Sequence, residues 1–91
     1  MYEHEIKPHL KEILQKLSKK NKALYEQVMK KIEEVISSSD IEHYKNLSYS
    51  MKELKRVHVG HFVLVFRFMK EENKLYFDDL DHHDKIYKRY R

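Results

Sequence analysis

The first half of the chain repeats apolar residues with the period of an α-helix. Pro8 suits the first turn of a helix, and the apolar side chains that follow it recur at i, i+3, i+4 and i+7. These side chains are Leu10, Ile13, Leu14 and Leu17. The pattern predicts an amphipathic helix that ends at a short connection, Ser18–Lys20.

A second helical pattern extends from about Asn21, whose side chain can cap a helix, to Ile36. Lysine and glutamate occupy the polar side of this segment, and Ser37–Asp40 ends it. Two amphipathic helices joined by so short a connection predict an antiparallel αα-hairpin. The apolar face of the second helix carries Leu24, Val28, Ile32, Val35 and Ile36.

From Lys52 onward the apolar period changes to two, which is the period of a β-strand. Val57 and Val59 alternate with Arg56 and His58. Because successive strand residues point to opposite faces, this segment predicts a strand with one apolar and one basic face.

Gly60-His61 is expected to form the turn after this strand, because glycine tolerates the backbone angles of tight turns. The next strand, Phe62–Phe68, is apolar on both faces, which is typical of a central strand covered on one side by helices. A hairpin loop at Lys70–Lys74 and a last strand at Leu75–Leu80 complete the pattern. One face of Phe62–Phe68 carries Phe62, Leu64, Phe66 and Phe68, and the other carries Val63, Val65 and Arg67.

Three segments give weaker signals. Tyr2–Lys7 is expected to be a short strand at a sheet edge, and Asp81–Arg91 receives no assignment. Ile41–Ser50 is expected to be a polar loop with three apolar side chains that could pack on the sheet: Tyr44, Leu47 and Tyr49. The fold class that follows is α+β, with an N-terminal strand and an αα-hairpin packed on a small, mostly antiparallel sheet. Residues 1–91 are expected to form a single domain.

Composition narrows the possible functions. The 19 lysines and arginines exceed the 15 acidic residues, giving a formal charge of +4 that favours a polyanionic partner. The chain has no cysteine, which excludes thiol catalysis, disulfides and cysteine-based zinc sites, and fits a reducing compartment. No apolar run approaches the roughly 20 residues of a membrane span, and the charged N-terminus is unlike a signal peptide. A soluble, cytoplasmic protein without a membrane partner is therefore expected.

Few of the polar residues are candidates for chemistry. Most lysines of the helices are interpreted as solvated surface, and three of the seven histidines, His4, His9 and His43, receive no role. Arg56 and His58 should project from the same side of their strand. Such a pair is either an exposed polar face or half of an anion site, and the sequence leaves both readings open.

The tail holds a second group of candidates. Adjacent histidines such as those of His82-His83-Asp84 point apart, and no further ligand follows at a characteristic spacing, so no metal site and no cofactor are predicted. A histidine of near-neutral pKa better suits general acid or base catalysis. Tyr87 shares a face with His83 if the tail is helical. The tail also carries cations that could contact a phosphate backbone: Lys85, Lys88, Arg89 and Arg91.

These groups are compatible with RNA cleavage. No nucleotide-binding loop, nucleophile elbow, EF-hand or zincin motif is present in the chain. RNA carries its own nucleophile in the 2′-hydroxyl group, so its cleavage requires only a base, an acid and a cation for the phosphate.

The order of these segments resembles that of the RelE/ParE toxin superfamily over nearly the whole chain. Arg56-Val57-His58-Val59-Gly60 is similar to the family's Arg-hydrophobic-Arg/His-hydrophobic-Gly run. Phe62-Val63-Leu64-Val65-Phe66 is similar to its following aromatic strand, and His82-His83-Asp84-Lys85-Ile86-Tyr87 to its terminal His-Arg-Asp-x-hydrophobic-Tyr.

The resemblance implies a toxin of a toxin–antitoxin module, partnered by a cognate antitoxin. RelE-like members cleave mRNA in the ribosomal A site by 2′-hydroxyl attack, whereas ParE-like members poison DNA gyrase. By position, Arg56 and His58 would hold phosphate or assist proton transfer. Tyr87 would stack on a base or organise the attack, and His83 would replace a terminal cation.

The chain departs from the family pattern at two positions. Val63 occupies the place of an arginine, and His83 the place of another. Arg67 has the same strand parity as Val63, but lies four residues, or about 13 Å, further along. Loss of one contact that stabilises a transition state typically reduces the rate by about 10²–10³.

The sequence thus predicts a ribosome-dependent mRNA endonuclease without a cofactor, whose partners are an antitoxin, the ribosome and mRNA. The alternatives are a gyrase inhibitor and an inactive protein that binds RNA or its antitoxin. The predicted catalytic residues are His58, His83 and Tyr87. The predicted phosphate-binding residues are Lys55, Arg56, Arg67, His82, Lys85, Lys88 and Arg89.

Overall fold

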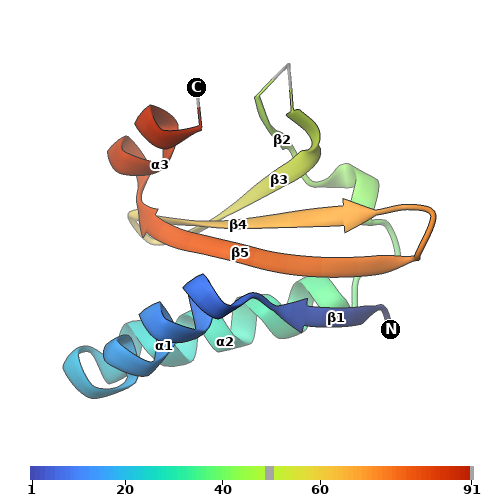
Figure 1. The fold of residues 1–91 in the computed structure, drawn as a ribbon. Coiled ribbons are helices and arrows are strands. Elements are labelled where there is room, and N and C mark those ends of the chain that lie inside the picture. Colours follow the sequence, from blue (N-terminus) through green and yellow to red (C-terminus); the bar gives the residue numbers. More distant parts are fainter. Residues whose placement is uncertain (49–50, 91) are drawn as a thin grey trace.

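The computed structural model describes residues 1–48 and 51–90. Five strands form one sheet in the order β1-β5-β4-β3-β2, with an αα-hairpin on one side and a short C-terminal helix on the other (Figure 1). The predicted α+β class, with an N-terminal strand and a helical hairpin on the sheet, is confirmed.

The helical hairpin consists of α1 (Pro8–Lys20) and α2 (Lys22–Ile36). Pro8 occupies the first turn of α1, and the Asn21 side chain caps α2 by accepting a hydrogen bond from the Leu24 N–H at 3.2 Å. The predicted connection Ser18–Lys20 is wrong, because these residues form the last turn of α1 and Asn21 alone separates the helices.

The strands are β1 (Glu3–Ile6), β2 (Asn46–Ser48), β3 (Met51–Val59), β4 (Phe62–Met69) and β5 (Lys74–His82). β1 pairs with β5 in parallel, and the other three pairings are antiparallel. Gly60-His61 forms the predicted turn between β3 and β4, with Gly60 at a φ of 60° that favours glycine. β4 is central, as expected from its two apolar faces.

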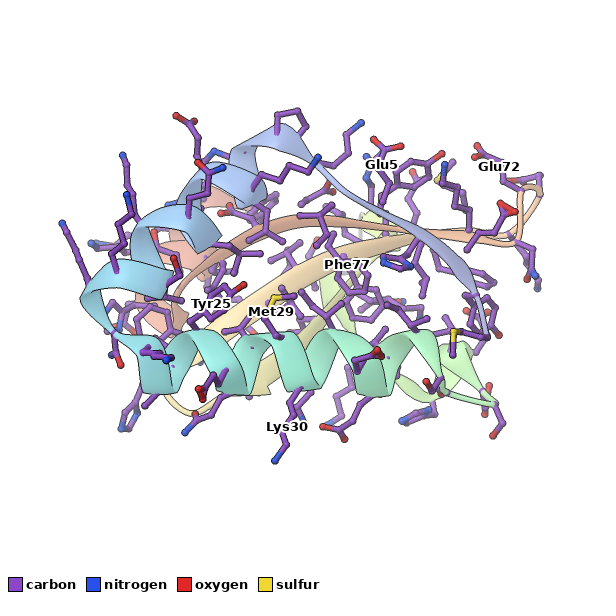
Figure 2. All side chains as sticks on the ribbon, turned by 90° about the horizontal axis from the view of Figure 1, so that it is seen from below. Glu5, Tyr25, Met29, Lys30, Glu72 and Phe77 are labelled. Carbon is purple, nitrogen blue, oxygen red and sulfur yellow. The ribbon has the colours of Figure 1, made fainter. Side chains whose placement is uncertain are left out.

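The two faces of the sheet pack against different elements. The main core lies between the sheet and the α1–α2 hairpin, and includes Leu64 and Phe66 of β4. Figure 2 shows Tyr25, Met29 and Phe77 in this layer, while Lys30 projects from the other side of α2. A smaller cluster on the opposite face contains four fully or nearly fully buried residues: Leu47, Val63, Val65 and Ile86.

Two segments without a firm prediction have regular structure. Ile41–Ser50 contains the 3-10 helix η1 (Ile41–His43) and β2 rather than a loop throughout. Tyr44 packs edge-on against Phe66 and Leu47 joins the smaller cluster, whereas Tyr49 lies outside the described residues. The tail forms α3 (His83–Arg89), which covers the face of the sheet opposite the α1–α2 hairpin (Figure 1).

Among the helices within residues 1–48 and 51–90, none is long and apolar enough to cross a membrane.

Candidate active site

Two elements bring four of the predicted residues together on the face of the sheet that carries α3. Arg56 and His58 project from β3 on this face, because Val57 and Val59 point into the main core. His83 and Tyr87 lie one helical turn apart on α3, so they share a side of the helix. We call these four residues the α3-face cluster.

The aromatic rings of the α3-face cluster lie one beside the next over the end of β3. The centroids of His58 and His83 lie 5.8 Å apart in a stacked arrangement, and those of His83 and Tyr87 lie 4.8 Å apart, edge to face. The guanidinium carbon of Arg56 lies 5.7 Å from the Tyr87 ring centroid, within cation–π range. The cluster thus combines one permanent cation, two imidazoles and one phenol.

Its electrostatics favour a neutral His58. The Arg56 Nη1 lies 3.3 Å from His58 Nε2, and since a guanidinium only donates, Nε2 must carry the lone pair. Burial, followed by the charges of Arg56 and His83, lowers the pKa of His58 below its ordinary value. Geometry and charge therefore both make His58 a proton acceptor near neutral pH.

Arg56 carries an unused donor. Its Nε is buried and has no hydrogen-bond partner among the described residues. A buried donor without an acceptor is costly, and such groups are uncommon in folded proteins. An arriving phosphate that drew the guanidinium toward it would supply oxygen acceptors for this group.

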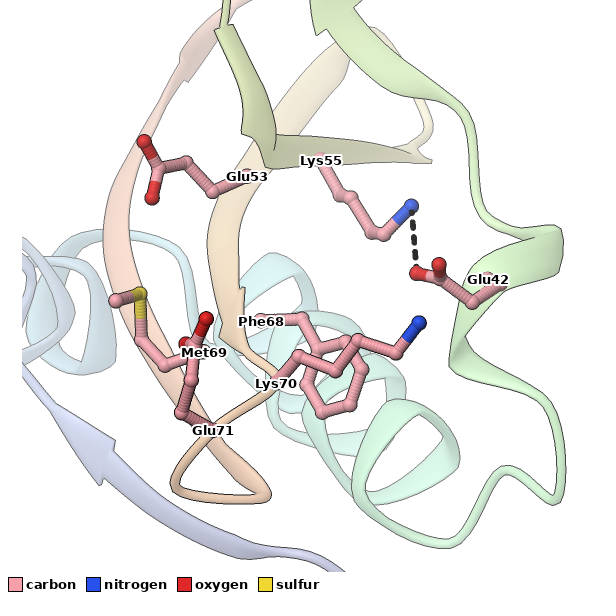
Figure 3. A pocket seen from close by; sticks show the side chains of 7 residues that line it. All are labelled: Glu42, Glu53, Lys55, Phe68, Met69, Lys70 and Glu71. Carbon is pink, nitrogen blue, oxygen red and sulfur yellow. Dashed lines mark ion pairs between the residues drawn. The ribbon is translucent and has the colours of Figure 1, made fainter.

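Lys55 lies on the opposite face of β3 and is not part of the cluster. The residue is only 5% exposed, and its Nζ donates to the Tyr44 carbonyl at 3.0 Å and to Asn46 Oδ1 at 3.2 Å. Lys55 lines a pocket and forms an ion pair with Glu42 (Figure 3), in which its Nζ lies 3.6 Å from Oε1. The sequence predicts both Lys55 and Arg56 as phosphate ligands. Because successive strand residues point to opposite faces, the two side chains lie on different sides of the sheet.

Carboxylates hold both Arg67 and Arg89. Arg67 lies on the α3 side of β4, where its Nε donates to Asp78 at 2.7 Å. Arg89 donates to Asp79 and, at 2.7 Å, to Asp81. The pKa of each arginine is raised mainly by these hydrogen bonds. The charge of each guanidinium is thus already paired with a carboxylate.

The remaining predicted residues lie around the rim of the cluster. Lys85 and Lys88 are exposed on α3, and neither forms an ion pair with the described residues. The His82 ring packs against Phe62, with centroids 4.3 Å apart, instead of facing the cluster. No group of three or more histidine and acidic side chains within residues 1–48 and 51–90 is placed to hold a metal ion.

The structure adds a polar network that the sequence pattern did not indicate. His9, to which no partner was assigned, lies with its Nε2 3.1 Å from the carboxylate of Asp79, 70 residues away. The Tyr90 hydroxyl donates to the same carboxylate at 3.1 Å, and burial, then Asp79, raises the pKa of Tyr90 to about 12. Contacts between residues so distant in sequence leave no periodic signal.

Comparison with known proteins gives this chain relatives along its whole length. No family model matches. The chain is 47% identical over 90 residues to the predicted toxin RelE4 of Methanocaldococcus jannaschii, covering 98% of this chain and 94% of the relative. It is 43% identical over 88 residues to an uncharacterized protein of Methanosarcina mazei, covering 96% and 100%.

Solved structures show the same fold. The isolated Escherichia coli RelE toxin superposes with a TM-score of 0.70 at 22% identity, covering all of both chains. A chain of the intact E. coli RelBE toxin–antitoxin complex gives a TM-score of 0.69 at 24% identity, covering 90% of this chain and 96% of that one. With the fold shared and nearly half the residues identical to a RelE toxin, the chain belongs to the RelE-like toxins of toxin–antitoxin modules.

Proposed function

We propose that this toxin is a ribosome-dependent mRNA endonuclease that cleaves by attack of the 2′-hydroxyl group on the adjacent phosphate. The observation that carries the proposal is the α3-face cluster, where Arg56, His58, His83 and Tyr87 lie within reach of one phosphodiester. Two imidazoles and a guanidinium supply a base, an acid and a phosphate ligand.

In the proposed reaction, neutral His58 accepts the proton of the 2′-hydroxyl group at Nε2. The hydroxyl group takes the place of Arg56 as the hydrogen-bond donor to this nitrogen. The 2′-oxygen forms a bond to phosphorus, and the bond from phosphorus to the 5′-oxygen breaks. His83 acts as the acid and gives a proton to that leaving oxygen. The products are a 2′,3′-cyclic phosphate and a 5′-hydroxyl end, so neither an external water nor a cofactor takes part.

Arg56 is proposed to neutralise the charge that develops on the phosphate oxygens, which also gives its buried Nε an acceptor. The ring of Tyr87 would stack on a base, because aromatic faces bind bases of any sequence. Lys85 and Lys88, exposed on the same helix, would contact the backbone on either side of the cut. We leave Lys55, Arg67 and Arg89 out of the proposed contacts because their charges are already paired.

The proposed partners follow from the family. A solved relative of the same fold is a toxin–antitoxin complex, which supports a cognate antitoxin for this chain. The net charge of +4 suits both an acidic antitoxin and ribosomal RNA. An enzyme that acts on translating ribosomes would work in the cytoplasm.

The test is mRNA cleavage on programmed ribosomes with purified protein. Codon-phased cuts are expected from the wild type, and His83→Ala and Tyr87→Ala should reduce cleavage by about 10² or more while leaving the fold intact. Tyr76→Ala is the matched control for Tyr87→Ala, since Tyr76 is a partly buried tyrosine of β5 whose hydroxyl binds Glu72 instead of the cluster. Normal cleavage by both His83→Ala and Tyr87→Ala would contradict the site.

One observation favours a second candidate, a family member that binds RNA, its antitoxin or gyrase without cutting RNA. Val63, where the family pattern has an arginine, is 0% exposed and packs in the smaller cluster beneath α3. No cation can reach the substrate from that position. Intact mRNA on verified ribosome complexes would support this candidate, and DNA damage in place of translational arrest would identify gyrase as the target.

A further inference from the structure

Asp79 is a carboxylate held in the interior, at an irregularity of the sheet. It is 1% exposed, and the pairing of β4 with β5 shifts register between Val65 and Phe66, opposite Asp78 and Asp79. A register shift of this kind re-aims side chains. A charged side chain is rarely buried without partners, because desolvation strongly disfavours it.

Four donors from three parts of the chain converge on this carboxylate. The Leu80 N–H donates at 2.8 Å within β5, and His9 Nε2 approaches from α1 at 3.1 Å. Tyr90, the residue after α3, donates its hydroxyl hydrogen to Asp79 at 3.1 Å. Arg89 of α3 donates to Asp79 through Nη1, while its Nη2 donates to Asp81. We call His9, Asp79, Arg89 and Tyr90 the Asp79 network.

The Asp79 network holds the last turn of α3 on the sheet. At its first residue, α3 is joined to the β3–β4 turn by the His83 N–H, which donates to the His61 carbonyl at 3.1 Å. Ile86 fixes its middle in the smaller cluster. A helix of seven residues is too short to be stable alone, so its last turn depends on contacts such as those of Arg89 and Tyr90.

We propose that Asp79 is a positioning residue that fixes α3 on the sheet, so that His83 and Tyr87 stand over His58 and Arg56. This inference rests on the proposed function, since it explains how the α3-face cluster is assembled. Rotation of a helix by even a small angle about Ile86 would separate the His58 and His83 rings, now 5.8 Å apart. Misplacement of about 1 Å at a reacting group can reduce a rate by about 10²-fold.

Two variants test the proposal. Arg89→Gln changes a side chain that is 42% exposed, so it should fold. Asp79→Asn keeps the size but removes the charge and replaces one of the two acceptor oxygens with an NH2 donor. Glu5→Gln is the matched control, because Glu5 also joins two cations, Lys7 and Lys74, yet touches no part of α3.

The first readout is independent of RNA. Amide hydrogen exchange in α3 should accelerate at least about tenfold in Arg89→Gln, as expected from losing a charged hydrogen bond, with β4 amides unchanged. The nuclear Overhauser contact between the His58 and His83 rings should weaken with it. Unchanged α3 exchange and an unchanged ring contact in Arg89→Gln would overturn the proposal, whether or not Asp79→Asn folds.

The second readout is kinetic. On ribosomes, kcat should fall about 10²-fold in Arg89→Gln with KM nearly unchanged, and Arg89→Lys should restore part of it by retaining the charge. Faster amide exchange in α3 together with a normal kcat would overturn the positioning role. A wild type that cuts no mRNA would refute the proposed function alone, and the ring contact would still decide whether Asp79 positions α3.

Discussion

The face of the sheet toward α1 and α2 buries thirteen of the described residues in one apolar cluster, whereas the face toward α3 buries four. The same strands build both faces. Val57 and Val59 of β3 enter the main core, while their neighbours Arg56 and His58 stand on the other side with the rings of α3. Strand alternation therefore lets one segment contribute to stability and to chemistry at adjacent positions.

This division means that substitutions on the two faces should have separable effects. A small domain has a stability of about 5–15 kcal/mol, and most of it must come from the larger cluster. The α3 face can therefore hold partly exposed, charged and unpartnered groups, such as Arg56 with its free Nε.

The largest expected effect is on the helix-covered face. Phe66 is 0% exposed in the middle of β4, and Phe66→Ala should lower the free energy of unfolding by about 3–5 kcal/mol by opening a cavity. Urea unfolding followed by circular dichroism measures the loss. Phe66→Leu is the control and should cost under about 1.5 kcal/mol. Equal urea midpoints for Phe66→Ala and the wild type would contradict the view that the helix-covered face provides most of the stability.

The next effect belongs to the α3 face. Arg56→Ala should reduce mRNA cleavage by about 10²–10³, because it removes the guanidinium that contacts His58, while the unfolding midpoint changes little. The control is Lys30→Ala, a cation of α2 that projects away from the sheet (Figure 2) and should leave cleavage unaltered. If both variants lose activity equally, net charge rather than the α3-face cluster determines the rate.

Much of the fold could be predicted because its signals are local. The apolar stripe of α1, the cap at Asn21 and the turn at Gly60 each depend on a few neighbouring residues. Periodicity also placed Arg56 with His58, and spacing placed Tyr87 beside His83 on the condition that the tail is helical. Those four residues form the observed α3-face cluster.

The rest depends on contacts between distant segments. β2 exists through its pairing with β3, and α3 through Ile86 and the Asp79 network, so neither has a strong pattern of its own. The partners of Arg89 and His9 likewise come from β5. Charge alone made Lys55 and Arg89 resemble phosphate ligands, and only the structure shows the acceptors that already hold them.

A smaller effect separates Lys55 from its neighbour Arg56. Lys55→Met should lower the free energy of unfolding by about 1–3 kcal/mol, because the Tyr44 carbonyl and the Asn46 side chain lose their donor. Cleavage below the unfolding transition should be unchanged. Lys70→Met is the matched control, since Lys70 lines the same pocket but is exposed (Figure 3). Reduced RNA cleavage by folded Lys55→Met would restore Lys55 to the site.

The smallest effect is on the titration of His58. Burial and the charges of Arg56 and His83 lower its pKa below the ordinary 6.5, so nuclear magnetic resonance should show His58 deprotonating below that pH. Arg56→Ala should raise this pKa, because removing a neighbouring cation favours the protonated ring. A wild-type His58 that titrates at or above 6.5 would contradict the role of base.

The lowered pKa of His58 determines how stability depends on pH. Since the folded protein binds this proton more weakly than the unfolded chain, neutral His58 contributes to stability above the unfolded pKa near 6.5, and the contribution is lost as the pH falls toward the folded pKa. Because the His58 ring is exposed, the loss of stability is small. Protonation of His58 would nevertheless remove the base required for cleavage. The acid limb of kcat/KM should lie below pH 6.5, so the base that the α3 face provides stays active at a pH where an ordinary histidine would already be protonated.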